Sequence, residues 1–205
     1  MEDTIIVHFL NLDVSCFELI LNAPCKGSPV ILVDIRYQGK LLHVVYDNLV
    51  APFKPVESVG RRTGWSLAIP GDDDMAGTDM CSKWEQIEGF FQDTIEHLLN
   101  EKGMKSPPIK QHILQPQTRE GKFLPYPPNV KFVLPTSADT RLATEIHVKA
   151  RLIPRFSTVN LTAHWEYIVI SHIHAVLSSS VTDIEFVSVF IRPIRDFSFL
   201  SSSRI

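Results

Sequence analysis

The 205-residue sequence has no apolar run long enough to cross a membrane, and its first residues do not have the pattern expected of a secretory signal. The longest late apolar stretch, residues 167–177, is interrupted by a serine and two histidines, whereas a spanning helix needs about 20 apolar residues. Residues 1–15 begin with two acids where a secretory signal needs positive charge. We therefore expect neither membrane insertion nor export.

Cysteine is scarce, and positive charge is not in excess. The three cysteines, Cys16, Cys25 and Cys81, cannot all pair within one chain and none has C-x-x-C spacing, which predicts a reducing, cytoplasmic compartment. The formal net charge is −3, so the chain lacks the basic field that holds a phosphate backbone. Another protein is therefore a more plausible partner than a nucleic acid.

The local signatures of common enzyme classes are also missing. The sequence contains no G-x-S-x-G nucleophile elbow and no G-x-x-x-x-G-K-[ST] phosphate loop, although residues 60–64 hold two arginines between glycines. The aspartates at 72–74 and Asp79 lack the alternate spacing of an EF-hand, which favours a solvated acidic loop over a calcium site. No cofactor is expected, and a non-catalytic chain is favoured.

What is present has the composition of a globular protein, with 44% hydrophobic and 21% charged residues. Segments rich in β-branched and aromatic residues, bounded by turn residues, predict strands at 4–10, 16–21, 30–37, 40–47 and 64–69. Gln38 and Gly39 separate two of these segments. Because glycine readily adopts positive φ, this pair predicts a two-residue turn and an antiparallel hairpin.

One segment, from Ser82 to Lys102, has the periodicity of an amphipathic helix. Its apolar stripe, with a period near 3.6, consists of Trp84, Ile87, Phe91, Ile95 and Leu98. Ser82 and Glu85 match a capping box at its start, and Gly103 is a typical stop. The stripe predicts that the helix packs on the sheet.

After this helix the chain changes character twice. Residues 103–129 contain six of the fourteen prolines and no apolar periodicity, which predicts a semi-rigid linker. Residues 130–134 and 143–153 follow as expected strands, the second because Ile146 and Val148 alternate with polar neighbours. From residue 157 onward there is no lysine and there are ten serines.

These patterns predict an α+β fold with an antiparallel sheet and one packed amphipathic helix, followed by a proline-rich connector and a small β-rich C-terminal part. The expected divisions are an α+β domain at 1–102, a linker at 103–129, a β-rich segment at 130–156 and an atypical hydrophobic, serine-rich tail at 157–205.

The composition change favours a tail outside the core, so that a chain ending at Phe156 would be as soluble and cooperative as the whole. The alternative is a hairpin across residues 178–180 that buries Ile168, Ile170 and Phe186.

Three histidines lie close together in the sequence HWEYIVISHIHA. On an expected strand, His172 and His174 project from one face, as in the H-x-H pair of cupin metal sites, and His164 is a candidate third ligand. The first downstream carboxylates are only at Asp183 and Glu185, which favours a polar strand face over a metal site. A metal-dependent enzyme of cupin-like β architecture using these histidines is nevertheless the alternative function.

A CFELI strand at 16–20, a helix, the connector and DTRLATEIHVKARLIPRF at 139–156 follow one another along the chain. In this order they resemble the N-terminal region of filamentous-fungal protein-kinase-like proteins, over residues 15–156. The resemblance implies a non-catalytic interaction or regulatory module that leads into a kinase-like region. No kinase residue is carried over, because in Arg195-Asp196-Phe197-Ser198 a serine stands where D-F-G has glycine and no catalytic loop precedes it.

Overall fold

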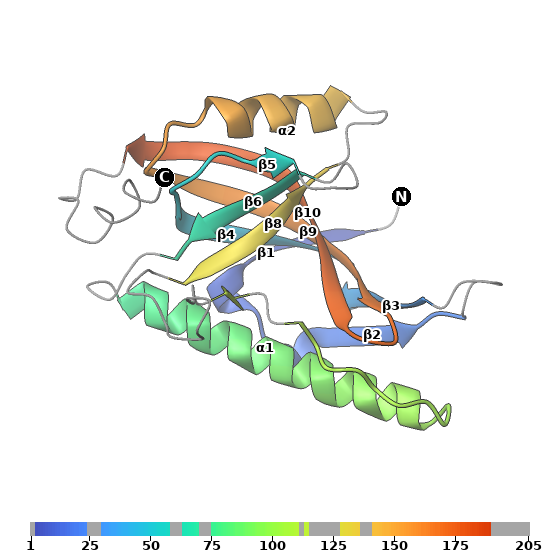
Figure 1. Cartoon of the computed structure of the whole chain (residues 1–205). Helices are drawn as coiled ribbons and strands as arrows, with labels where there is room; N and C mark the ends of the chain where they lie inside the picture. Colours follow the sequence, from blue (N-terminus) through green and yellow to red (C-terminus); the bar gives the residue numbers. More distant parts are fainter. Residues whose placement is uncertain are drawn as a thin grey trace, which may run out of the picture.

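The structure, a computed structural model, describes residues 3–23, 30–57, 63–69, 75–110, 113–114, 128–135 and 141–189. Within them the chain has an α+β fold, with one mixed sheet, helix α1 (Met75–Asn100) and helix α2 (Arg141–Leu152) (Figure 1). Two short 3-10 helices, η1 (Phe9–Asn11) and η2 (Val14–Cys16), follow the first strand. Neither α-helix in this part of the chain is long and apolar enough to cross a membrane.

Ten strands make up the sheet. They are β1 (Thr4–His8), β2 (Phe17–Leu21), β3 (Ile31–Tyr37), β4 (Leu41–Ala51), β5 (Val56–Glu57), β6 (Thr63–Ala68), β7 (Ile113–Leu114), β8 (Asn129–Leu134), β9 (Ser157–Ile170) and β10 (Ala175–Val189). The main order is β1-β4-β6-β8-β10-β9-β3-β2, and β4 also pairs with β9. Five of these strands therefore form a closed ring in the order β4-β6-β8-β10-β9. β1 pairs with β4 outside this ring, and β3 pairs with β9.

The sheet is mixed, which corrects the prediction of a purely antiparallel one. β1 lies parallel to β4, and β8 parallel to β10, whereas the remaining pairs are antiparallel. The predicted two-residue turn is present: Gln38 and Gly39 have φ angles of 51° and 72°, and Tyr37 and Lys40 form an antiparallel bridge across them. The prediction of antiparallel neighbours is wrong beyond this bridge, because β3 pairs with β2 and β9 and β4 pairs with β1, β6 and β9. Two successive positive φ angles match the right-handed twist of the flanking strands.

An aromatic core fills the space between the ring of strands and α1. Along β9, alternate side chains point inward, and Trp165 is fully buried. Its Nε1 donates to the Tyr46 hydroxyl at 3.1 Å, and its ring stacks on Trp84 of α1 with centroids 5.3 Å apart. Figure 1 shows α1 running beneath the sheet, so the helix covers this end of the core.

The predicted amphipathic helix exists, but it starts earlier than expected. Its buried stripe runs Met80, Trp84, Ile87, Phe91, Ile95 and Leu99, so Leu99 takes the place predicted for Leu98, which is only partly buried. Because α1 begins at Met75, Ser82 lies inside the helix and the capping-box prediction is wrong. The predicted stop is confirmed: Gly103 has a φ of 68°, and the Met104 amide donates to the Leu99 carbonyl at 2.9 Å.

Residues 143–152 of the predicted strand at 143–153 lie in α2 instead. Ala143, Ile146 and Ala150 are buried at i, i+3 and i+7, whereas Val148 and Leu152 of the supposed alternating face are exposed. The segment is rich in strong helix formers, so propensity and burial agree on a helix. At the C-terminal end of α2, Nζ of Lys54 donates to the carbonyl of Arg151, at 2.6 Å, and to the carbonyl of Ile153.

The start of the predicted linker is attached to the fold. The Lys110 amide donates to the Ala175 carbonyl at 2.8 Å, and the Ile109 amide donates to the Gln92 side chain at 2.7 Å. Residues 115–127, the centre of that predicted linker, lie outside the described residues.

Residues 157–189 are placed differently from the expected appended tail. They form β9 and β10, the two longest strands, and β9 pairs along its length with β10 on one side and with β4 and β3 on the other. The hairpin turns at residues 171–174 rather than at 178–180, and Phe186 is exposed. Residues 190–205, including the Arg195–Ser198 sequence, lie outside the described part.

Candidate functional site

Two histidines meet on the outer face of the ring, opposite the core. His43 of β4 is the register partner of His164 of β9, and their rings stack with centroids 4.8 Å apart and an interplanar angle of 14°. The same row continues to Ile6 of β1 and to Ser180 of β10.

The strand geometry explains why these rings touch. The Leu41 amide donates to the Asp3 carbonyl, so alternate residues of β4, including His43, direct their backbone groups toward β1 and away from β9. His43 and His164 are consequently a non-hydrogen-bonded pair, the closer type of antiparallel pair.

A hydroxyl lies beside the ring of His43. The Thr182 Oγ1 donates its single hydrogen to the Thr162 carbonyl at 3.3 Å, because a carbonyl oxygen can only accept. Oγ1 also lies 3.3 Å from Nδ1 of His43, and it accepts there when its own hydrogen is donated to Thr162. In that arrangement Nδ1 of His43 carries the proton, and Nε2 carries a lone pair.

Both imidazoles are biased toward the neutral form. Burial lowers the pKa of His43, and the neighbouring His164 lowers it further. Burial also lowers the pKa of His164, and the positive charge of Arg36 on β3 adds to this effect. Nε2 of His164 is buried and has no hydrogen-bond partner within the described residues. Such an orphaned polar atom is uncommon and carries a free-energy penalty.

The neighbouring strand β1 is an edge of the sheet. Because Asp3 bonds to β4, the backbone groups of Ile5 and Val7 also point toward β4, and those of Thr4, Ile6 and His8 point away from it. No described strand pairs with that outer side. The Ile6 side chain is 68% exposed on the outer face.

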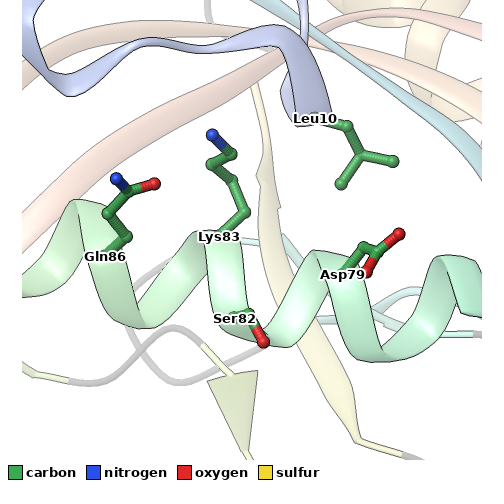
Figure 2. Close-up of a pocket in the computed structure, with 5 residues that line it drawn as sticks. All are labelled: Leu10, Asp79, Ser82, Lys83 and Gln86. Carbon is green, nitrogen blue, oxygen red and sulfur yellow. The ribbon is translucent and has the colours of Figure 1, made fainter.

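A separate hollow lies between η1 and α1 (Figure 2). Its volume is about 510 Å³, and it is lined by Leu10, Asp79, Ser82, Lys83 and Gln86. Figure 2 shows Lys83 reaching from α1 toward the η1 segment, and its Nζ donates to the Leu12 carbonyl at 2.8 Å. Lys83 thus ties the helix to the loop, so the hollow is a packing feature of this contact.

The structure separates the histidines that the sequence singled out. His172 and His174 lie in the four-residue turn between β9 and β10, where both are exposed. The turn is organised by Ser171, whose amide donates to the His174 carbonyl at 2.9 Å. His164 lies six residues before the end of β9, about 20 Å along the strand. The two turn histidines are therefore not on one strand face, and His164 is far from both.

No group of three or more His, Cys, Asp or Glu side chains suited to a metal ion occurs among the described residues. Residues 72–74 of the acidic loop and Arg61 and Arg62 lie outside the described ranges. Asp79, expected in the loop, lies within α1. Comparisons of the sequence with models of protein families and with curated proteins find no match.

Sequence reasoning missed His43 as a partner of His164. The only local signal was that His43 alternates with the apolar residues Leu42 and Val44, which places it on the polar face of its strand. That signal predicts the strand face on which His43 lies, but it does not predict that His164 is its neighbour. The register between β4 and β9, which brings the two together, depends on the whole sheet.

Proposed function

We propose that the chain is a non-catalytic interaction or regulatory module that binds an extended segment of another protein along the outer edge of β1. The observation that carries the proposal is the outward direction of the backbone groups of Thr4, Ile6 and His8. Unpaired N–H and C=O groups on an edge strand are a template for one more strand, and peptide-binding domains use such edges.

The chemistry of β1 supports this use of the edge. Edge strands are commonly protected by lysine, other charged residues or proline, and Thr4–His8 contains only a histidine beside apolar residues and a threonine. The other terminal strand, β2, carries Glu18 and contacts α1. β1 is therefore the less protected of the two edges.

The size of the edge favours a peptide over a second copy of this chain. Five residues at about 3.3 Å each give an edge about 17 Å long, and with a sheet layer about 10 Å thick the footprint is about 170 Å². A stable protein–protein interface needs about 800 Å² on each partner. The occupant we expect is thus a segment of about five extended residues, with β-branched or aromatic side chains beside Ile6.

Selection from a phage-displayed library of random seven-residue peptides tests the proposal. Peptides enriched on the immobilised protein should alternate β-branched or aromatic residues with polar ones. Ile6→Pro should weaken their binding by more than about tenfold, because proline removes an outward N–H while the inward groups of Ile5 and Val7 stay in place. Ile6→Val keeps the amide and should bind like the parent.

The two variants also define the result that overturns the proposal. A thermal melt must show that Ile6→Pro is folded, as expected for proline whose nitrogen faces outward on an edge. Equal peptide binding by Ile6→Pro and Ile6→Val, or failure to enrich any peptide, would count against an edge-binding module.

A finer proposal is that this module leads into a kinase-like region, in the cytoplasm. The first part rests on the sequence resemblance of residues 15–156, and the location rests on cysteine usage, with which the free thiol of Cys16 agrees. The alternative of a metal-dependent enzyme using His172 and His174 stays a prediction. Stoichiometric metal in the purified protein that is lost when both are changed to alanine would favour it.

A further inference from the structure

Several histidines use their ring nitrogens in contacts within the chain. Nδ1 of His8 lies 2.6 Å from Asp47, Nε2 of His97 lies 3.4 Å from Glu101, and Nε2 of His147 lies 2.6 Å from the Pro135 carbonyl. In the stacked pair, by contrast, Nε2 of His43 and Nε2 of His164 have no hydrogen-bond partner in the described part of the chain. The pair therefore has two available nitrogens on neighbouring strands.

These nitrogens have the features of metal ligands. When Thr182 accepts the proton of Nδ1, the Nε2 of His43 carries the lone pair that a metal ion needs. Metal-bound histidines usually donate their second ring N–H to such an outer partner, which fixes the ring orientation. Two imidazoles are a donor set suited to zinc, copper or nickel.

The spacing of the rings is close to what chelation requires. A tetrahedral ion with bonds of about 2.0–2.1 Å to nitrogen brings its two ligand atoms to about 3.4 Å from each other. The ring centroids are 4.8 Å apart and the planes nearly parallel, so the two in-plane lone pairs do not meet in the stacked arrangement, and binding requires the rings to rotate out of the stack until both Nε2 atoms face one ion. The pair lies on the outer face of the sheet, where the ring of His43 is only partly buried.

We propose that His43 and His164 form a two-histidine site for a divalent transition metal, with Thr182 as the positioning residue of His43. This site is independent of peptide binding at β1 and differs from the histidine cluster singled out in the sequence, of which it shares only His164.

Calorimetric titration of the tag-free, EDTA-treated protein with nickel chloride at pH 7.5 tests the site. The parent should bind one nickel ion per chain. His43→Gln and His164→Gln should each weaken binding by more than about tenfold, and Thr182→Val should weaken it by about tenfold, because the ring loses its outer partner.

The turn histidines provide a matched control. His172→Gln/His174→Gln removes two exposed histidines without touching the stacked pair, and it should leave the affinity unchanged. Loss of binding in this double variant, unchanged binding in both single variants, or the absence of a stoichiometric site in the parent would each overturn the proposal.

Electron paramagnetic resonance of the Cu²⁺-loaded parent protein provides a readout that needs no variant to fold. The spectrum should show two imidazole nitrogens bound to one copper ion. A spectrum with one imidazole nitrogen, or with three or more, would contradict a two-histidine site.

Discussion

His43 and His164 are held with stacked rings on a face of the sheet that is partly exposed to water. Two charged imidazoles at this distance would repel each other, and each would lose solvation. The neutral pair avoids both penalties, which is why burial and mutual proximity lower the pKa of His43. The neighbouring titratable and charged groups are His8 on β1, which contacts Asp47 of β4, and Arg36 on β3, whose positive charge acts on His164.

The pair should make stability depend on pH. Each histidine has a folded-state pKa below its unfolded value of about 6.5. Between the lowered pKa values and about pH 6.5 the unfolded chain therefore binds more protons than the folded one, so the free energy of unfolding rises with pH. The stabilisation is fully present above about pH 6.5 and decreases as the pH falls through the lowered pKa values.

Thermal melts in EDTA at pH 7.5 and pH 5.5 measure this effect. The melting temperature of the parent should fall more between these conditions than that of His43→Gln/His164→Gln, which has lost the titrating pair. An equal fall in both proteins would show that other groups set the pH dependence.

Much of the residue-scale picture could be read from the sequence, but not the site. The alternation of His43 and His164 with apolar neighbours is a signal that could have placed both on the polar faces of their strands. Their contact depends on the register between β4 and β9, and the Thr182 bond depends on the irregular pairing of β10 beside residues 181–183. Neither feature has a local sequence signature.

Helix α1 shows how well a long periodic pattern determines an element. Its stripe predicted the helix and its buried face, and Gly103 predicted its end. The sequence placed the start of the helix too late, because Ser82 and Glu85 have the spacing of a capping box although they lie inside the helix. The buried Met80 extends the apolar stripe toward the true start. In α2, a short segment, a period of two fitted as well as a period of 3.6, so pattern alone could not choose between them.

Phe91 tests whether α1 is a core element or a docking surface. Its side chain is 2% exposed and contacts Phe17 edge to face, with centroids 5.1 Å apart. Phe91→Ala should lower the free energy of unfolding by about 3–5 kcal/mol, measured by urea denaturation.

The exposed face of the same helix provides the control for Phe91. Glu96→Ala should change the free energy of unfolding by no more than about 0.5 kcal/mol. A folded Phe91→Ala protein with the parent's stability would show that the side chain does not anchor the core.

At the scale of the whole molecule, β9 is the strand that closes the ring. It pairs with β10 along one side and with β4 and β3 along the other, and Val159, Leu161 and Ala163 are fully buried. The unusual composition after residue 157 concealed this role, because a lysine-free, serine-rich segment can also form strands with one polar face. Closure is a long-range property that single-sequence patterns do not contain.

Truncation tests the closure. A chain ending at Phe156 loses β9 and β10, which leaves edges of β4, β8 and β3 unpaired and exposes the core face of Trp84. It should be insoluble, or unfold without a cooperative transition in a calorimetric melt. A soluble, cooperative protein would instead support the original expectation of an appended tail.

Residue-resolved amide hydrogen exchange by NMR tests most directly whether β1 is a peptide-binding edge. In the free protein, the amides of Ile5 and Val7 should be protected, and those of Ile6 and His8 should exchange rapidly. A saturating concentration of a selected peptide should slow exchange at Ile6 and His8 by more than about tenfold, because their amides then donate to the added strand. Unchanged exchange at these two amides, with new protection in α2 or around the hollow beside α1, would contradict the account.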